Sequence, residues 1–405
     1  MSRVKLGVIR EGKVPPDFRV PLTPEQCRLV EDKFPMVQVI VQSSPIRSFK
    51  DEEYRELGIE VQDDLSECDV ICGVKEVNVE DLIPGKKFLF FSHTIKKQPY
   101  NRKLLQAILD QKIQLIDYEV LKDKKGKRLI GFGRYAGIVG CYNGFRAFGR
   151  KHGLFELKAA NACADRDEVH EELKKVKLPK NTKIVLTGFG RVGNGAREII
   201  DRLPIKEVSA EEFLKEEFDE PVYTHLDTGD YYARKDGKGY EKSDFYSNPQ
   251  EYKSVFNDYA ACSDMYVACH YWSSKSPFIL TAEDLQKDDR LKVVADVSCD
   301  IAEPIACTIR PSTIQDPFYG YDPVSGQETD YKNEKAVMVM AVDNLPCELP
   351  KDASEDFGNE LIRHILPALF LEDPDRIIER GSETDLEGRL TPGFEYLQDF
   401  VNSEG

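Results

Sequence analysis

The 405-residue sequence contains no apolar run of 18 residues and no pair of cysteines spaced as Cys-x-x-Cys. The first absence argues against a membrane-spanning helix. The second, together with the lack of a matching histidine spacing, argues against a zinc site, so no metal is expected. The ten cysteines are scattered and are interpreted as reduced thiols. The N-terminus lacks the apolar core of a secretory signal, and a cytoplasmic protein is expected.

Positive charge is also in short supply. There are 56 Lys and Arg residues against 72 Asp and Glu, which gives a formal net charge of −16. Nucleic acids and anionic membranes are polyanions, so neither is an expected partner. Hydrophobic residues make up 41% of the chain, with 21 Phe and 18 Tyr, which excludes a disordered chain. This length predicts about two to three domains.

Short apolar runs alternate with longer amphipathic stretches in the first part of the chain, the pattern of a parallel α/β sheet. A helix is predicted after Thr23 and Pro24, a capping residue followed by proline in the first turn. The predicted strands are residues 4–9, 37–42, 69–74, 87–91 and 113–118.

Titratable side chains follow four of these strands. In an open parallel sheet, ligands bind at the carboxyl ends of the strands. Any one such residue is more simply interpreted as a solvated loop residue, but four strand ends together favour a site. The residues are Arg10 and Glu11, Lys75 and Glu76, His93, and Glu119.

Several cations lie close to these strand ends. Arg19 follows the first strand by a short loop, Lys96 lies just beyond His93, and Arg128 precedes the segment LIGFGRYAG. An arginine can bind a carboxylate through two parallel hydrogen bonds. In a strongly acidic protein, this cluster with Lys75 predicts a ligand that carries several carboxylates.

The α/β pattern restarts at residues 181–187, where a β-branched run leads directly into Gly188, Gly190 and Gly193 and then into a helical pattern. Glycines at this spacing, between a strand and a helix, let the backbone approach a pyrophosphate at the helix N-terminus. Further strands are predicted at 264–269, 291–298 and 336–342. The prediction is therefore an α/β protein with two Rossmann-like domains, whose parallel sheets flank a central cleft. The tyrosine-rich insertion from Tyr223 to Tyr259 is predicted to pack under a loop.

The second strand of this dinucleotide-binding unit is predicted at residues 205–208, ending at Ser209. An Asp or Glu is usual there when the cofactor is NAD, and a nearby basic residue when it is NADP. Neither is present, although Glu211 and Glu212 would repel a 2′-phosphate. The cofactor is predicted to be NAD or NADP, with a lean towards NAD.

Several blocks of the sequence resemble a known family. The opening, GVIREGK and RVPLTP, resembles the N-terminal domain of alanine dehydrogenases and transhydrogenases. The blocks GVKE, FFSHTIK, LIDYE, LTGFGRVGNGA, DVSCD and VDNLPCELPKDASEDFG resemble the saccharopine dehydrogenase family, most closely the lysine–ketoglutarate reductase part of aminoadipic semialdehyde synthases. The resemblance covers nearly the whole chain.

The resemblance implies roles for individual residues. Lys75 and His93 fall on the family's catalytic lysine and histidine, with Glu76 as an acidic partner. The residues implied to bind substrate are Arg19, Lys96, Glu119, Arg128 and Phe132. With Gly188 of the glycine loop, those expected to contact the dinucleotide are Gly190, Arg191, Tyr271, Val297, Asp343 and Leu345. The domains are predicted as residues 1–140 with 346–405, and residues 141–345, with a helix at 355–370 packed on the first.

The implied reaction joins L-lysine and 2-oxoglutarate into saccharopine through an imine that NAD(P)H reduces. Each step moves a proton, which requires groups that titrate near neutrality; a lysine reaches this range when burial or neighbouring cations lower its pKa. The alternatives are an alanine dehydrogenase-like or other amino-acid dehydrogenase, and a non-catalytic nucleotide-binding protein. The physiological direction stays open, and the chain is compatible with an oligomer.

Overall fold

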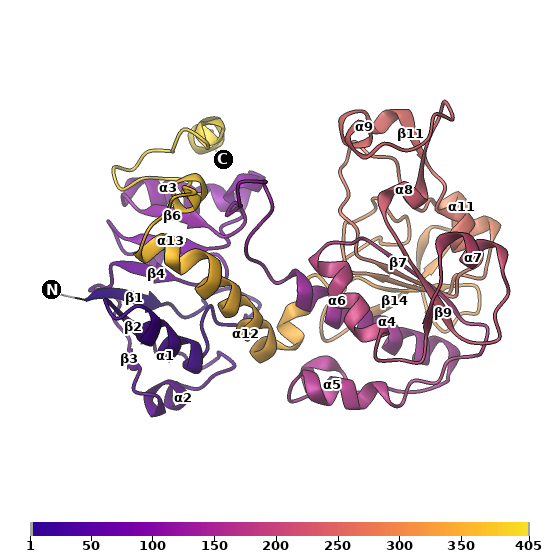
Figure 1. The fold of residues 1–405 in the computed structure, drawn as a ribbon, viewed down its shortest axis with the longest axis horizontal. Helices are drawn as coiled ribbons and strands as arrows, with labels where there is room; N and C mark the ends of the chain where they lie inside the picture. The colour runs from indigo at the N-terminus through magenta and orange to yellow at the C-terminus, as the bar shows by residue number, and fades with distance from the viewer. Residues whose placement is uncertain (1–2, 404–405) are drawn as a thin grey trace. The chain divides into compact units, whose positions relative to one another are not determined.

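The computed structural model describes residues 3–403 and divides the chain into two units. The first comprises Met1–Phe132 and Pro350–Gly405, and the second Gly133–Leu349. Figure 1 shows the yellow C-terminal segment lying among the indigo and purple elements of the first unit. The chain passes between the units at 132/133 and 349/350, whereas the predicted boundaries were 140/141 and 345/346. The first boundary differs because helix α4 (Gly133–His152) belongs wholly to the second unit.

The first unit contains a six-stranded, wholly parallel sheet in the order β3-β2-β1-β4-β5-β6. The strand order reverses between β1 and β4, where open α/β sheets bind ligands. Five strands coincide with predicted runs, and β3 was not predicted. The strands are β1 (Val4–Val8), β2 (Val37–Gln42), β3 (Glu60–Gln62), β4 (Val70–Cys72), β5 (Lys87–Phe90) and β6 (Gln114–Asp117).

Helices from both ends of the chain cover this sheet. The predicted cap of α1 is confirmed: the Thr23 hydroxyl accepts from the Gln26 amide in a capping box. Gln26 also donates to the Glu355 carbonyl at 2.8 Å, and Phe357 and Leu361 enter the sheet's core, so the predicted packing of the C-terminal helix is confirmed. The longer elements are α1 (Pro24–Lys33), α2 (Asp51–Glu56), α3 (Arg102–Asp110), α12 (Pro350–Glu360), the π-turn η7 (Leu361–Ile365), α13 (Leu366–Phe370), α14 (Ile377–Gly381) and α15 (Gln398–Asn402). The 3₁₀ turns are η1 (Val79–Asp81), η2 (Thr94–Lys96), η3 (Pro99–Asn101) and η8 (Glu395–Leu397).

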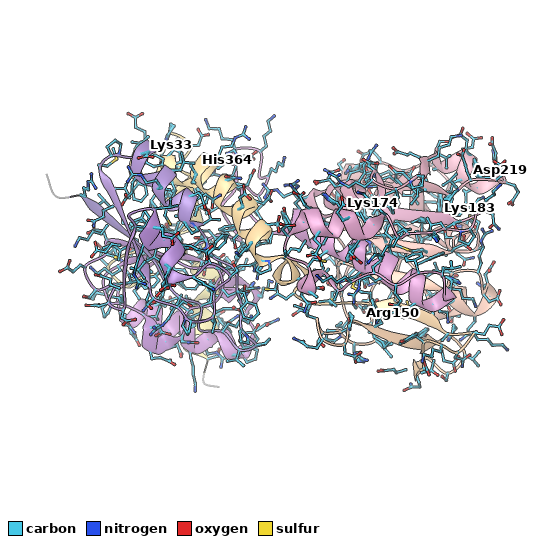
Figure 2. The ribbon with its side chains drawn as sticks, turned by 90° about the horizontal axis from the view of Figure 1, so that it is seen from below. Lys33, Arg150, Lys174, Lys183, Asp219 and His364 are labelled. Carbon is cyan, nitrogen blue, oxygen red and sulfur yellow. The ribbon has the colours of Figure 1, made fainter. Side chains whose placement is uncertain are left out.

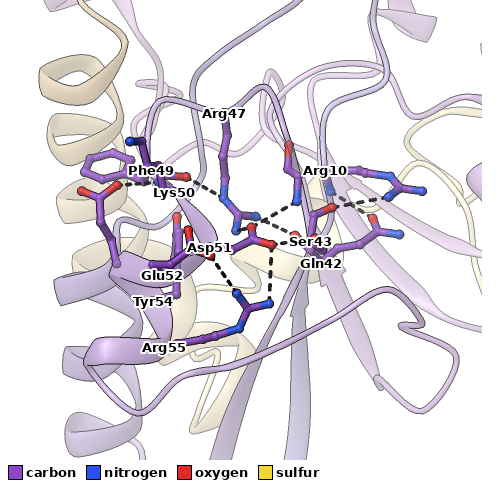
Figure 3. Close-up of polar contacts among 12 residues, drawn as sticks. Arg10, Gln42, Ser43, Arg47, Phe49, Lys50, Asp51, Glu52, Tyr54 and Arg55 are labelled. Carbon is purple, nitrogen blue, oxygen red and sulfur yellow. Dashed lines mark hydrogen bonds and ion pairs between the residues drawn. The ribbon is translucent and has the colours of Figure 1, made fainter.

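A polar network at the end of β2 holds α2 in place (Figure 3). Asp51 accepts from the Ser43 hydroxyl at 2.6 Å and pairs with Arg47. Burial opposes ionisation, but these hydrogen bonds and the Arg47 charge together lower the pKa of Asp51. Arg10, which follows β1, donates to the Ser43 carbonyl at 3.4 Å. Its guanidinium therefore lies on the β2 side of the sheet.

The second unit contains an eight-stranded sheet in the order β15-β14-β16-β13-β12-β7-β9-β8. Six strands are parallel, and β14 and β15 form an antiparallel edge that was not predicted. The strands are β7 (Lys183–Thr187), β8 (Lys206–Glu207), β9 (Val222–Leu226), β12 (Met265–Ala268), β13 (Val293–Asp296), β14 (Phe318–Asp322), β15 (Gln327–Thr329) and β16 (Val337–Met340). In a separate two-stranded sheet, β10 (Tyr232–Arg234) pairs antiparallel with β11 (Tyr252–Ser254).

The prediction for the second strand of this sheet was wrong. The strand next to β7 is β9, and the segment predicted for that place forms only the short edge strand β8. All five residues of β9 are buried, whereas both residues of β8 are exposed. Burial on both faces is what a central strand of a covered parallel sheet requires.

Helices surround the second sheet. Lys183 of β7, labelled in Figure 2, holds one of them against the sheet through hydrogen bonds. Its buried ammonium donates to the Phe213 and Glu216 carbonyls at 2.8 and 2.7 Å, at the end of α7. The helices are α4, α5 (Arg166–Leu173), α6 (Arg191–Ile200), α7 (Ala210–Lys215), α8 (Thr228–Tyr231), α9 (Lys242–Ser247), α10 (Asn257–Ala260) and α11 (Ala282–Lys287). The 3₁₀ turns are η4 (Ala160–Ala162), η5 (Pro249–Glu251) and η6 (Leu345–Glu348).

The aromatic insertion packs as predicted. Tyr231, Tyr232, Phe245 and Tyr252 belong to the buried core beside β9. Within residues 3–403, no helix combines the length and the apolar character that crossing a membrane requires.

Helices α4 and α6 touch backbone to backbone through glycines. A Cβ on Gly137 would lie 1.8 Å from the Val192 carbonyl oxygen, and one on Gly195 would lie 2.0 Å from the Arg134 carbonyl oxygen. The obstacle in both cases is backbone, which cannot rotate away, so the two helices can approach this closely only where no side chain intervenes.

We predict that Gly137→Ala destabilises the protein by about 1–3 kcal/mol or more, because overpacking must push the two helices apart. The measurement is the urea midpoint of unfolding. Gly393→Ala serves as control, because a Cβ there meets nothing within 4 Å. Equal midpoints for the two variants would contradict the close contact.

Candidate active site

The side chains predicted to form a site gather at the carboxyl edge of the first sheet. Glu11 follows β1, Lys75 follows β4, His93 follows β5 and Glu119 follows β6. These four strands are consecutive neighbours in the sheet. The strand-order reversal lies between the first two, so the edge has the position of a ligand site in an open α/β sheet.

Glu11 ties the two strands at the reversal together. Its carboxylate oxygens accept the backbone amides of Val74 and Lys75 at 2.6 and 2.9 Å. Burial and the nearby negative charge of Asp17 raise the pKa of Glu11 to about 8, against the opposing effect of those amides. The position of Glu11 at a strand end was predicted from the sequence, but no role was predicted for it.

Lys75 has no counter-ion among the described residues. Within residues 3–403, its ammonium group forms no hydrogen bond or ion pair. Burial lowers the pKa of Lys75, and the positive charges of Arg19 and Lys13 lower it further. Both effects favour the neutral amine, and the direction of the shift agrees with the prediction.

His93 belongs to a short charge chain. Its Nδ1 lies 2.5 Å from Glu76 Oε1, and Glu76 Oε2 lies 3.2 Å from the Lys13 ammonium. Burial acts to raise the pKa of Glu76, but the hydrogen bond and charge of His93, with Lys13, hold it at about 2. The other ring nitrogen, Nε2, forms no hydrogen bond to any residue in the described part of the chain.

The backbone of His93 is strained. It has φ 54° and ψ 12°, the left-handed region. For a residue with a side chain, this conformation costs roughly 1–2 kcal/mol. Such strain persists only where the surroundings hold it, and it is concentrated at functional sites.

The predicted substrate-binding residues Glu119, Lys96 and Arg128 form one cluster. Arg128 Nη2 lies 2.9 Å from Glu119 Oε1, and the Lys96 ammonium lies 3.7 Å from the same oxygen. Both cations are about half exposed. Glu119 Oε2 is buried and has no hydrogen-bond partner among residues 3–403. The two cations therefore already face a carboxylate of the protein itself.

Arg19, expected to bind a substrate carboxylate, is buried against a carboxylate of the protein. It is only 2% exposed and forms a two-pronged pair with Asp17, at 2.9 and 2.5 Å. Its guanidinium lies 4.2 Å from the centre of the Phe132 ring, which stacks on Phe357 at 4.5 Å. The carboxylate bound by Arg19 in this structure thus belongs to Asp17. The Asp-x-Arg spacing in the sequence could have indicated this ion pair.

The glycine loop of the second unit lies between β7 and α6, as predicted. Gly188 has φ 95°, and a Cβ there would lie 2.4 Å from the Cys269 carbonyl oxygen. Gly190 caps α6 and has open space around it, and the first turn of α6 carries no acidic residue. A pyrophosphate requires close backbone approach and a helix N-terminus without negative side chains, so the loop fits a dinucleotide.

The other residues expected to contact the dinucleotide lie at the same edge of the second sheet. Tyr271 follows β12 and is 79% exposed, and Val297 directly follows β13. Asp343 and Leu345 follow β16, while Arg191 begins α6 beside the loop. Val297 and Leu345 also pack on α4, where a Cβ on Gly140 would meet both.

Asp227, not Ser209, follows the second strand of this dinucleotide-binding unit, where a residue that contacts the ribose is expected. Asp227 follows β9, the neighbour of β7, and caps α8 while accepting from Lys242 at 3.1 Å. Ser209 instead caps the surface helix α7 through a capping box with Glu212. The prediction that placed Ser209 there was wrong, because β8, the strand before Ser209, lies at the edge of the sheet.

The described residues contain no group of three or more His, Cys, Asp or Glu side chains arranged to hold a metal ion.

Comparison with solved structures identifies the fold. The chain has the fold of L-alanine dehydrogenase: a solved structure of that enzyme superposes with a TM-score of 0.65 at 17% identity, covering 98% of this chain and 100% of that one. Residues 7–139 match the family model described as "Alanine dehydrogenase/PNT, N-terminal domain".

Sequence comparison finds homologues that match most of this chain. The chain is homologous to the alpha-aminoadipic semialdehyde synthase of Arabidopsis thaliana, with 31% identity over 97% of this chain and 41% of that protein. It is also homologous to the saccharopine dehydrogenase [NAD(+), L-lysine-forming] of Yarrowia lipolytica, with 27% identity over 90% of this chain and 92% of that protein. The chain thus spans less than half the length of the semialdehyde synthases it matches.

We predict that the His93–Glu76 pair makes stability depend on pH. The folded-state pKa of Glu76, about 2, lies below its ordinary value of 4.5. Its contribution is therefore fully present above pH 4.5 and is lost as the pH falls towards 2. A shift of this size corresponds to roughly 3 kcal/mol.

The measurement is the urea-unfolding free energy of the wild type and of Glu76→Gln at pH 5.5 and 3.5. The wild type should be the more stable protein at pH 5.5, and the difference should shrink at pH 3.5. Glu56→Gln, at an exposed position, controls for the loss of a glutamate in general. A difference that stays constant with pH would refute the role of this pair.

Proposed function

We propose that this protein interconverts L-lysine plus 2-oxoglutarate and saccharopine, using a nicotinamide dinucleotide. The named activity of the Yarrowia lipolytica relative supports this proposal. The observation that carries it is that two proton-transfer groups follow adjacent strands. The Lys75 ammonium has no partner in the described part of the chain, and His93 is held by the carboxylate of the neighbouring Glu76. Bound NAD(P)H supplies the hydride that reduces the imine, and NAD(P)⁺ accepts it in reverse.

The two residues have separate tasks in this scheme. The amine of lysine attacks the ketone of 2-oxoglutarate, and the carbinolamine then loses water. His93 gives and takes the protons of these two steps through Nε2, because Nδ1 is engaged by Glu76. Lys75 exchanges the proton of the secondary amine. The lowered pKa of Lys75 supplies a neutral amine at a lower pH than an ordinary lysine would.

The cations at the sheet edge suit saccharopine, which carries three carboxylates. Arg128 and Lys96 face Glu119 and are half exposed, so a substrate carboxylate can reach them by taking the place of Glu119. Arg19 would have to exchange Asp17 in the same way, and its burial makes this harder. We therefore assign Arg128 and Lys96 to the substrate, and Arg19 to holding Phe132 and lowering the pKa of Lys75.

An alanine dehydrogenase-like activity is the second candidate, favoured by the fold. Pyruvate has a single carboxylate, so only one of the two exposed cations would receive a substrate carboxylate. An assay of NADH and NADPH consumption with lysine plus 2-oxoglutarate, and separately with pyruvate plus ammonia, decides between them. Turnover with neither pair would favour a non-catalytic nucleotide-binding protein.

We predict that Lys75→Met and His93→Gln each lower kcat with lysine and 2-oxoglutarate by about 10²–10⁴-fold, the usual yield of general acid–base catalysis. Binding of NAD(P)H should persist, because the glycine loop is unchanged. The pH profile of kcat/KM should lose one limb in each variant. Lys124→Met, at an exposed lysine paired with Asp375, is the matched control. Near-native turnover in both test variants would show that the two residues only support the strand ends.

We further propose that NAD(H) is preferred over NADP(H). A carboxylate that follows the second strand accepts a hydrogen bond from the ribose 2′-hydroxyl and repels a 2′-phosphate. Asp227 has this position. Asp227→Ala should raise the KM for NADH by roughly ten- to a hundredfold, the effect of losing a hydrogen bond to a charged group. It should also lower the KM for NADPH.

Ser209→Ala is the control that separates the two candidate positions, and it should leave both KM values unchanged. A change in the KM for NADH in Ser209→Ala alone would reverse the assignment.

A further inference from the structure

Two fully buried carboxyl groups lie beneath the turn that carries His93. Asp117 is the last residue of β6, and Glu383 comes from the C-terminal segment; both side chains are 0% exposed. Between them lie the hydroxyls of the residues on either side of His93. Ser92 Oγ donates to Asp117 Oδ2 and lies 2.6 Å from Thr94 Oγ1, which donates to Glu383 Oε2 at 2.5 Å.

The C-terminal segment holds this turn at both ends. The turn η2 begins after His93 and ends before Lys97, and both flanking residues have the left-handed conformation. Glu383 binds Thr94 at its start, and the Lys97 ammonium donates to the Tyr396 carbonyl at 2.8 Å at its end. The segment is anchored to the sheet by the Glu383 amide, which donates to the Leu115 carbonyl at 2.8 Å.

Asp117 extends the contact to the neighbouring strand end. Its Oδ2 accepts the Ser92 amide at 3.1 Å, and its Oδ1 accepts the Glu119 amide at 2.6 Å. Burial raises the pKa of both carboxyls, and the charge of Asp117 raises that of Glu383 further. We therefore expect the pair to hold one proton, with one negative charge between them. One carboxyl can then donate to the other and still accept from the hydroxyls.

We propose that Glu383, acting with Asp117, is a positioning residue that holds His93 in its left-handed conformation and so fixes where its ring points. Nothing in the proposed chemistry touches Glu383 directly. The inference rests on the proposed function for its kinetic consequence, but the placement of the ring can be measured without any activity.

The kinetic test compares Glu383→Ala, Glu383→Gln and the control Glu387→Ala. Glu387 lies four residues further on, is 66% exposed and pairs only with Arg389 in the described structure. Glu383→Ala should lower kcat by about ten- to a hundredfold, the effect of a catalytic group displaced by about 1 Å. Its KM for NADH should stay unchanged.

Glu383→Gln should restore kcat to within about threefold of the wild type. Its side-chain oxygen can accept from Thr94, and its amide nitrogen can donate to Asp117 as the shared proton does. Rescue by glutamine is expected of a hydrogen-bonding position and not of a catalytic carboxylate. If kcat in Glu383→Gln falls as far as in Glu383→Ala, the carboxylate itself is required and the inference is overturned.

The second measurement is independent of catalysis. Protein labelled with ¹⁵N-histidine gives ring signals for its six histidines, and His93→Gln identifies those of His93. In Glu383→Ala the His93 signals should shift or broaden while the other five stay in place. Glu383→Gln and Glu387→Ala should keep the wild-type signals, and thermal melting should show all variants folded at the assay temperature.

These two readouts separate the hypotheses. If the wild type shows no turnover, the proposed function fails, and the ring signals alone decide the inference. If Glu383→Ala leaves the His93 signals unmoved, or only lowers the melting temperature without changing kcat or those signals, Glu383 is a stability residue and the inference is overturned.

Discussion

Buried carboxyl groups that accept backbone amides from the next strand end hold the functional edge of the first sheet together. Glu11, after β1, accepts the amides of Val74 and Lys75 after β4. Asp117, at the end of β6, accepts the amides of Ser92 after β5 and Glu119 after its own strand. A buried polar group without a partner is costly, so each bond is strongly preferred. The strand ends that carry the proposed catalytic and substrate-binding residues therefore form one connected frame.

Several cations at this edge of the sheet are paired with carboxylates of the protein itself. Arg19 pairs with Asp17, Arg128 with Glu119, and Lys13 with Glu76. Lys75 has no such partner in the described chain, and burial favours its neutral form. In the proposed mechanism, the Lys75 amine is thereby available for proton exchange. The substrate would displace the carboxylates from the paired cations, most readily where these cations are exposed.

The second unit shows how sheet order decides the chemistry at a cofactor edge. The glycine loop forms at the first strand of the unit whichever strand pairs with it. The neighbour of that strand determines which residue lies at the ribose position. Because β9 takes that place and β8 is at the edge, the residue proposed to meet the ribose is Asp227, and the proposed preference for NAD(H) follows from strand pairing.

Local features were predictable from the sequence alone. Five of the six strands of the first sheet, the Thr23 cap, the glycine loop and the gathering of Lys75, His93 and Glu119 at strand ends all depend on patterns within a few residues of one another. Periodicity and capping act over this range, so a single sequence reports them. The blocks resembling a known family added the roles of these residues.

Long-range pairing was decided only by the tertiary structure. Nothing in the sequence near Glu383 indicates that its carboxyl lies against Asp117, because the two residues are 266 positions apart. The choice of β9 over β8 likewise depended on which segment could be buried on both faces. Sequence patterns determine which elements form and which groups their ends carry, whereas packing decides which of those groups meet, since the strength of a buried polar contact depends on what surrounds it.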